Sequence, residues 1–471
     1  MTTPSPAPAP ESFDTLALSA ASRENLRRLG YIEMTAIQAA SLPVALQGRD
    51  LIAQAKTGSG KTAAFALALL ARLDVRRFAA QAMVLCPTRE LADQVATEIR
   101  RLARSEDNVK VVTLAGGVPL RGQTASLEHG AHVVVGTPGR VLDHLARGNL
   151  ELNALATLVL DEADRMLDMG FFDDIAAVIR QCPASRQTLL FSATYPDGIA
   201  KLAKRFLRDP VTVKVEAQHN REQIDQRWYE VREDERLLVV ARLLEHFRPE
   251  RALAFCNTRV RCRELARLLQ AQGYSALALH GELEQRDRDH VMVSFVNGSC
   301  SVLVATDVAA RGLDVAGLSA VINVDIPSDP EAYVHRIGRT GRANESGLAV
   351  SLASLDEMDS VGRIDQLQGR PSVWHALTKL TPTPGGRLIP AMATVQIQAG
   401  RKDKIRAGDV LGALTADLGY TREQVGKIDI NEFFTYVAME RSIAHEAASR
   451  LDSGRIKGRT VRARMLTPPR E

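Results

Sequence analysis

The chain has 471 residues, of which 45% are hydrophobic and 25% are charged, and its formal net charge is +4. This length predicts two or three domains, and the slight positive charge suits a nucleic-acid partner without requiring one. None of the five cysteines stands in a Cys-x-x-Cys pair, which argues against a zinc site or a disulfide framework and favours a reducing cytoplasm. No apolar run approaches membrane length, so we expect no membrane partner.

Three folded units are expected, separated by two linkers. A Pro/Ala-rich leader comes first, and its composition predicts disorder rather than a signal peptide. Two series of short apolar runs alternating with helical patterns follow, which is typical of parallel sheets covered by helices on both faces. The expected boundaries are a leader over 1–12, a first domain over 13–215, a linker over 216–226, a second domain over 227–380, a linker over 381–390 and a third unit over 391–471.

The apolar runs mark the strands that we expect in the two larger domains. Examples in the first domain are residues 82–86, 132–135, 158–160 and 188–191. In the second domain they are residues 252–256, 276–279, 302–305, 320–324 and 348–352.

A glycine-rich turn at residues 55–62 precedes a helical pattern and predicts a phosphate-binding loop. Its glycines allow backbone N–H groups to converge on an anion, and Lys61 brings a positive charge to the β- and γ-phosphates. The Thr62 hydroxyl can ligate Mg²⁺. The predicted nucleotide-binding residues of this loop are Ala55, Lys56, Thr57, Gly58, Ser59, Gly60, Lys61 and Thr62.

Two acidic residues, Asp161 and Glu162, follow the apolar run 157–160. We expect Asp161 to hold Mg²⁺ through a water, and Glu162 to orient and deprotonate the attacking water. A phosphate loop followed by such a pair predicts a nucleoside triphosphatase that uses Mg²⁺.

Further motifs appear in a fixed order. They are Pro-Thr-Arg-Glu-Leu-Ala at 87–92, Gly-Gly at 116–117, Thr-Pro-Gly-Arg at 137–140, Asp-Glu-Ala-Asp at 161–164, Ser-Ala-Thr at 192–194, Ala-Thr-Asp at 305–307 and His-Arg-Ile-Gly-Arg-Thr-Gly-Arg at 335–342. Over roughly residues 13–355 this order resembles the core of the DEAD-box ATP-dependent RNA helicases. The resemblance implies an α/β fold with two RecA-like parallel-sheet domains in tandem, RNA-stimulated ATP hydrolysis, and RNA as the partner.

The resemblance also implies roles around the nucleotide. Gln38 reads the adenine edge with its amide, and Asp314 contacts the ribose. Arg339 and Arg342 act as arginine fingers that reach the γ-phosphate when the two domains close. Phe13 is placed to stack on the base, although it is also compatible with an ordinary hydrophobic staple.

Other residues are implied to couple the nucleotide to RNA or to hold RNA by its backbone. The coupling residues are Asp164, Ser192 and Thr194. The RNA-binding residues of the two domains lie at strand ends and helix starts, where N–H groups and arginines favour phosphates. They are Thr88, Arg89, Gly117, Thr137, Gly139 and Arg140 in the first domain and Arg259, His280, Gly281 and Thr306 in the second.

The third unit reads as strand, helix, strand, strand, helix, strand, an order that predicts an RRM-like α+β domain. The elements are residues 394–397, 408–418, 428–430, 434–439, 442–451 and 460–465. Phe433, Phe434 and Tyr436 are candidates for stacking on RNA bases, but strand alternation places some of them equally well in the core.

Two basic segments of the third unit favour RNA binding through Arg401, Lys402, Lys404, Arg406, Arg455 and Lys457. The stretches 400–414 and 454–459 resemble the C-terminal domain of a bacterial subgroup of the family that acts in large ribosomal subunit assembly. That resemblance implies large-subunit ribosomal RNA and pre-ribosomal particles as partners, with no obligate protein partner evident. The alternatives are a general RNA helicase of broad substrate range and a non-catalytic RNA-binding scaffold, and Lys61, Glu162 and Arg342 argue against the scaffold.

Overall fold

The computed structural model describes residues 12–55, 58–106, 108–215, 224–310, 318–341, 347–384 and 389–467. The chain divides into two compact units, Met1–Gln218 and His219–Glu471, and each is described by itself. In the described part of the chain, no helix has the length and apolar character needed to span a membrane.

The first unit is built on one sheet of seven described strands, all parallel, in the order β3-β4-β2-β5-β6-β1-β7. The strands are β1 Leu51–Gln54, β2 Ala82–Leu85, β3 Val111–Leu114, β4 Val133–Gly136, β5 Thr157–Leu160, β6 Gln187–Ser192 and β7 Val211–Lys214. The four runs expected as strands are confirmed as β2, β4, β5 and β6.

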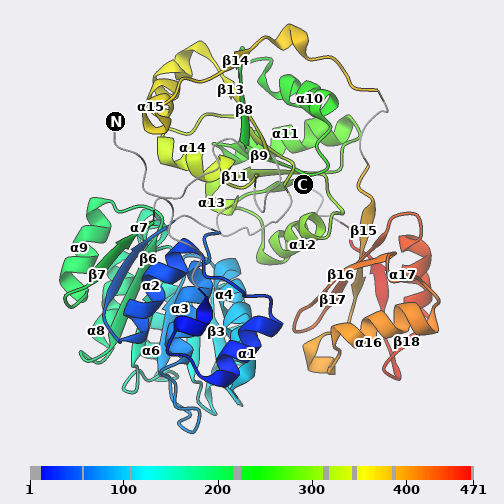
Figure 1. The fold of residues 1–471 in the computed structure, drawn as a ribbon. Coiled ribbons are helices and arrows are strands. Elements are labelled where there is room, and N and C mark those ends of the chain that lie inside the picture. The colour runs from blue at the N-terminus through cyan, green and yellow to red at the C-terminus, as the bar shows by residue number, and fades with distance from the viewer. Residues whose placement is uncertain are drawn as a thin grey trace. The chain divides into compact units, whose positions relative to one another are not determined.

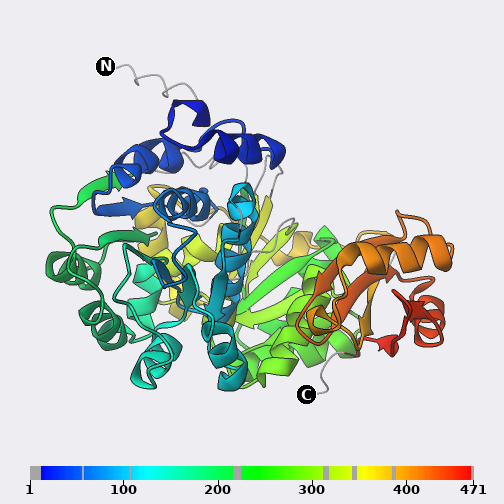
Figure 2. The ribbon, with the colours of Figure 1, turned by 90° about the horizontal axis from the view of Figure 1, so that it is seen from below.

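Helices cover both faces of this sheet, as Figures 1 and 2 show. Ala82 and Val84 of β2 pack into a core with α2, α3 and α4, whereas Met83 and Leu85 pack into a second core with α8 and α9. Because successive side chains of a strand point to opposite faces, an unbroken apolar strand requires this double cover. The helices are α1 Ala20–Arg28, α2 Ala36–Leu46, α3 Lys61–Leu70, α4 Arg89–Leu102, α5 Leu120–Leu127, α6 Pro138–Ala146, α7 Ala163–Asp168, α8 Phe172–Arg180 and α9 Asp197–Phe206, after a short 3₁₀ turn at Phe13–Thr15.

The second unit begins with another parallel sheet, in the order β10-β11-β9-β12-β13-β8-β14. Its described strands are β8 Ile224–Glu230, β9 Ala252–Cys256, β10 Ala276–Leu279, β11 Val302–Thr306, β12 Ala320–Asn323, β13 Gly347–Ala353 and β14 Trp374–His375. Its helices are α10 Arg236–Phe247, α11 Arg259–Ala271, α12 Gln285–Val296, α13 Asp307–Ala310, α14 Pro330–Ile337 and α15 Met358–Gln368. The five runs expected as strands are confirmed.

Strand β8 corrects the expected linker over 216–226. The strand starts at Ile224, which pairs with Gly347 of β13, so the last three residues of that stretch belong to the sheet. The sequence did not indicate this strand because many of its residues are polar. A ladder of backbone hydrogen bonds does not require apolar side chains.

The C-terminal module has an antiparallel sheet in the order β16-β17-β15-β20. Its elements are β15 Met392–Ile397, α16 Ala407–Gly412 with a π-helical turn at Ala413–Asp417, β16 Val425–Ile430, β17 Thr435–Glu440, α17 Ala444–Asp452, a hairpin of β18 Arg455–Ile456 with β19 Arg459–Thr460, and β20 Ala463–Met465. The βαββαβ order is confirmed. The last strand starts later than expected, because residues 459–460 pair in the hairpin.

The two faces of the module's sheet have different neighbours. Val395 and Val437 point into the core that α16 and α17 close. Thr394, Gln396 and Tyr436 are polar residues, and their exposed fractions are only 3%, 0% and 3%. Strand alternation therefore places these polar side chains on the face away from the module's own helices, so a second body must cover it.

The preceding α/β domain of the same unit provides this cover. The side chain of Asn297 donates to Thr394 Oγ1 across 3.3 Å, and the hydroxyls of Ser299 and Thr394 lie 2.6 Å apart. Arg441 donates to the backbone oxygen of Ser299 across 3.2 Å. The sheet face of the module is thus docked on the end of α12 and the loop that follows it.

Candidate ATP site and RNA-contacting surfaces

The described part of the phosphate loop joins β1 to α3 with two glycines in the left-handed region. The φ angles of Gly58 and Gly60 are 82° and 92°, which L-residues rarely adopt. Gly60 is the N-cap of α3, and a glycine has no side chain to bond the N–H groups at the helix start. A glycine at this position leaves room for an anion beside these N–H groups, as a phosphate site requires.

Lys61 and Asp161 form the charged centre of this site. Lys61 is 6% exposed, and its ammonium donates to the backbone oxygen of Ala55 across 2.7 Å. Burial raises the pKa of Asp161 to about 7, the charge of Lys61 opposes that rise, and Glu162 adds to it. A divalent cation stabilises the charged form of a carboxyl group that burial disfavours, so Asp161 fits a Mg²⁺. Thr62 lies half-buried in the first turn of α3.

Gln38 lies next to the phosphate loop, but its amide is largely occupied within the protein. Its oxygen accepts from the backbone N–H of Thr35 across 2.8 Å, and its NH₂ group donates to the backbone oxygen of Gly60 across 3.1 Å. These two bonds tie the start of α2 to the phosphate loop. The predicted contact of Gln38 with adenine stays a prediction.

Phe13 lies in the hydrophobic core of the first unit. It is 3% exposed and packs edge-on against Tyr31, with 6.0 Å between the ring centroids and an interplanar angle of 83°. This is ordinary core packing and not the hydrophobic staple that the sequence left open, because Phe13 does not directly precede Ser19, the N-cap of α1, and Tyr31 lies beyond the end of that helix. Stacking on a base stays a prediction that needs the ring to move.

Asp164 links the acidic motif to the Ser-Ala-Thr motif. One of its carboxylate oxygens accepts from the backbone N–H groups of Ala193 and Thr194 across 3.1 and 2.9 Å and from the Thr194 hydroxyl across 3.0 Å. The backbone N–H of Asp164 donates to the Ser192 hydroxyl across 3.3 Å. Burial raises the pKa of Asp164, but the hydrogen bonds from Thr194 and the charge of Lys61 outweigh it, so the net pKa lies below its usual value.

The residues predicted to hold RNA in the first unit lie on three neighbouring loops. Thr88 follows β2, Gly117 follows β3 and Thr137 follows β4, and the sheet order is β3-β4-β2. Arg140, in the first turn of α6 directly after the third loop, donates to the backbone oxygen of Val118 across 3.0 Å and so ties α6 to the loop that follows β3. Gly139 is exposed, and Arg89 pairs with Asp93 at 3.6 Å.

The second unit repeats this arrangement. Arg259 follows β9, Gly281 follows β10 and Thr306 ends β11, and these strands are neighbours in the order β10-β11-β9. His280 is 3% exposed, whereas Arg259 pairs with Glu282 at 2.9 Å on the surface. Each sheet thus brings three loops with predicted RNA contacts to its carboxyl edge.

Sequence reasoning assigned no role to Arg336, which the structure places at the centre of a buried network. Arg336 is 1% exposed, and its guanidinium donates to both carboxylate oxygens of Asp307 across 2.7 and 2.6 Å and to the Asn257 side chain across 2.8 Å. It also lies over the Phe255 ring, 5.1 Å from the centroid. Three segments of the second unit that are far apart in sequence therefore meet at one side chain. The sequence feature that could have indicated a role for Arg336 is its position within the motif at 335–342.

The arginine-finger prediction rests on residues that the structure describes only in part. Arg339 is 7% exposed. Lys56, Thr57, Asp314 and Arg342 lie outside the described residues. Their roles stay predictions.

The two basic segments of the C-terminal module form one surface. Lys457 donates to the backbone oxygen of Lys404 across 3.3 Å and pairs with Asp409 at 3.5 Å. Arg459 of the same hairpin pairs with Asp403 at 3.4 Å. Arg401, Lys402, Arg406 and Arg455 are exposed around these contacts.

The aromatic candidates of the module differ in exposure. Phe433 is 53% exposed, and the ammonium of Lys402 lies 4.2 Å from its ring centroid. Tyr436 is buried on the docked face of the sheet, with 6.4 Å between its ring centroid and that of Phe434. Phe433 is therefore the aromatic ring that is open to a base, beside the basic surface.

Comparisons with known proteins identify the family. Residues 35–202 match the DEAD/DEAH box helicase family, residues 235–344 match the helicase conserved C-terminal domain, and residues 394–465 match the DbpA RNA binding domain. The ATP-dependent RNA helicase DbpA of Escherichia coli is 50% identical over 456 residues, which cover 97% of this chain and 99% of that protein. The chain belongs to the DEAD-box ATP-dependent RNA helicases. As a member it is an RNA-stimulated ATPase with a DbpA-type RNA-binding domain.

Other DEAD-box helicases match the core alone. CshA of Geobacillus kaustophilus is 45% identical over 360 residues, which cover 76% of this chain and 77% of that protein. The solved structure of S. cerevisiae Dbp5 bound to RNA and ADP BeF3 is 31% identical, with a TM-score of 0.72, over 78% of this chain and 96% of that chain. The RecA-like fold of the DEAD-box core is thereby confirmed for both parallel-sheet domains.

Proposed function

We propose that this DEAD-box helicase uses Mg²⁺ and ATP to remodel large-subunit ribosomal RNA during ribosome assembly in the cytoplasm, and that the C-terminal module selects the RNA. The observation that carries the proposal is the joint basic surface of residues 401–406 and 455–459. Backbone contacts by the core loops favour phosphates and carry no sequence information, so selectivity has to come from the module. The similarity to DbpA over nearly the whole chain supports the ribosomal target.

The chemistry follows from the residues of the ATP site. The N–H groups at the start of α3 and the Lys61 ammonium bind the phosphates, while Thr62 and Asp161 would hold Mg²⁺, which would neutralise charge on the phosphates. Glu162 takes a proton from the attacking water. Arg339 and Arg342 complete the site when the domains close, and Asp164 transmits the nucleotide state to Thr194.

The experiment compares ATP hydrolysis by the full chain in the presence of large-subunit ribosomal RNA with hydrolysis in the presence of an unrelated RNA of equal length. A triple variant of Arg401, Lys402 and Lys404 to Gln should lose the preference for ribosomal RNA and bind it with a weaker salt dependence, because fewer phosphates are neutralised. A chain without residues 386–471 should remain a weak ATPase that does not discriminate between RNAs.

The rival functions predict other outcomes. Equal stimulation of the full chain by both RNAs would leave a general RNA helicase of broad substrate range. Absence of any RNA-stimulated phosphate release would leave an RNA-binding scaffold.

A further inference from the structure

A cavity of about 190 Å³ lies where the C-terminal module is docked on the second α/β domain. It is lined by Arg286, Asp287 and His290 from α12, by Arg464 from β20 and by Leu466 and Thr467, which follow β20. One water takes up roughly 30 Å³ in the liquid. The cavity therefore has room for a group larger than a single water.

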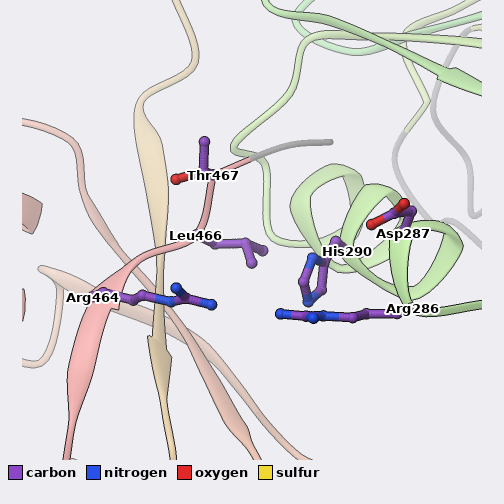
Figure 3. Close-up of a pocket in the computed structure, with 6 residues that line it drawn as sticks. All are labelled: Arg286, Asp287, His290, Arg464, Leu466 and Thr467. Atoms are coloured by element: carbon purple, nitrogen blue, oxygen red, sulfur yellow. The ribbon is translucent and has the colours of Figure 1, made fainter. Parts of the chain in front are cut away.

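Two arginines from different domains converge on this cavity. Figure 3 shows the guanidinium groups of Arg286 and Arg464 pointing toward one another across it. Arg464 donates from Nε to the Gln396 side chain across 3.1 Å, and neither arginine forms an ion pair with a carboxylate among the described residues. Two facing cations repel each other, so an anion between them would turn this repulsion into two attractions.

His290 supplies a buried polar group at the same place. It is 7% exposed, and neither of its ring nitrogens has a hydrogen bond with another described residue. Burial and the charges of Arg286 and Arg464 lower its pKa, while the carboxylates of Asp287 and Asp289 act in the opposite direction. Because the His290 ring lines the cavity, its N–H can donate to a group bound there. A bound anion would accept that N–H.

We propose that this cavity binds a phosphate of the RNA backbone, held by Arg286 and His290 from the helicase core and by Arg464 from the C-terminal module. The planar guanidinium groups suit the oxygens of a phosphate, and the domains on either side both belong to RNA-binding families. The proposal rests on RNA binding by this chain and is independent of the ribosomal target.

One consequence concerns how the module is held. Because the phosphate would touch both domains, RNA that fills the cavity stabilises the docked arrangement, and docking in turn strengthens the binding of RNA. The cavity then adds a contact that neither domain makes alone.

The experiment uses the full chain and two fluorescent probes, an oligouridylate and a large-subunit ribosomal RNA fragment, titrated at several salt concentrations. The variants are Arg286→Gln, Arg464→Gln and their combination. The matched controls are Arg267→Gln and Arg422→Gln, which remove the same charge from exposed positions of α11 and of the module. Arg286→Lys keeps the positive charge but lacks the planar guanidinium group. Circular dichroism checks that each variant is folded.

The expected result for at least one RNA is roughly tenfold weaker binding by each single variant. Since both arginines hold one phosphate, the double variant should lose less than the sum of the two, and its slope of log affinity against log salt should fall by about 0.7. Arg286→Lys should keep most of the slope, and the controls should behave as the natural chain.

Unchanged affinity and slope for both RNAs in the folded double variant would overturn the proposal. A parallel arm uses inorganic phosphate and thermal unfolding. If phosphate stabilises the natural chain but not the double variant, while RNA binding is unaltered, the cavity is a site for free phosphate and the RNA proposal is rejected. If the natural chain binds both RNAs equally well, this result argues against the ribosomal target but not against the cavity. The variants still test the cavity in that case.

Discussion

Arg165 donates a hydrogen bond from Nη1 to Oε2 of Glu162 across 2.6 Å, one helical turn away along the acidic motif. Both side chains are nearly buried, with 10% and 7% of their surface exposed. Glu162 itself has a left-handed backbone with φ 52°, directly before α7. A strained backbone and a buried ion pair together hold the carboxylate of the predicted base in one orientation.

Replacement of Glu162 by Gln should preserve this geometry and remove the chemistry. The amide oxygen still accepts from Arg165, so ATP and RNA should bind as before, but the amide cannot take a proton from water. We expect hydrolysis to fall by a factor of roughly 10² or more. Phosphate release and nucleotide titration measure the two effects, with Glu128→Gln on the exposed end of α5 as the control. Near-normal turnover by a folded variant would contradict the role of Glu162.

Gly60→Ala should weaken nucleotide binding through a defined clash. A Cβ at this position would lie 2.6 Å from the Gln38 side-chain nitrogen, and φ of 92° disfavours any L-residue. Gly170→Ala is the matched control, because Gly170 also has a positive φ of 81° but no atom within 4 Å of the added Cβ. The backbone cost of roughly 1–2 kcal/mol is common to both variants. Only Gly60→Ala should therefore lower affinity for ATP in a titration, and equal affinities would argue against a phosphate loop held by Gln38.

The sequence was sufficient for most strands whose two faces are both apolar, although the largely buried strands β1 and β3 were not among the expected runs. β5 and β9 are continuous apolar runs, and each is fully buried in the centre of its sheet. Strands with mixed faces were not foreseen: β7 alternates between half-buried and exposed residues at the sheet edge, and β14 has only two residues. In such strands the ladder of backbone hydrogen bonds decides the structure, and the side-chain pattern is weak.

The site residues divide in a similar way, into local motifs that could be predicted from the sequence and long-range contacts that could not. The phosphate loop and the acidic pair are local motifs, so their chemistry could be predicted from neighbours in the chain. The meeting of Arg336 with Asp307 and Asn257, and the burial of Thr394 and Gln396, depend on segments far apart in sequence. A polar residue at an alternate strand position is ordinarily solvent-facing, and only the docked domain makes it buried.

Asp164→Asn should uncouple hydrolysis from RNA unwinding. The carboxylate accepts three hydrogen bonds from Ala193 and Thr194, and the neutral amide would weaken bonds to a charged acceptor that are worth about 1.5–3 kcal/mol each. We expect strand separation per ATP to fall more than hydrolysis does. Parallel unwinding and phosphate-release assays measure the ratio, and an unchanged ratio would contradict the coupling role.

The same residue gives a stability test against pH. The pKa of Asp164 is below its ordinary value of 3.8 in the folded protein, so its contribution to stability is present above that value and is lost as the pH falls through the lower pKa. Denaturant unfolding of the natural chain should therefore lose stability on acidification more steeply than Asp164→Asn. Identical slopes would show that the Asp164 carboxylate does not stabilise the fold.

Thr394→Arg should release the C-terminal module from the second domain without unfolding either. Thr394 is 3% exposed against Asn297 and Ser299, on the face of the sheet that is opposite to the module's own core. Overpacking at such a contact costs about 1–3 kcal/mol, which is enough to shift a docking equilibrium. Small-angle scattering should give a larger radius of gyration than the natural chain, while circular dichroism is unchanged. Thr421→Arg, at an exposed position of the module, is the control. A folded Thr394→Arg variant with the scattering curve of the natural chain would show that this contact does not hold the module in place.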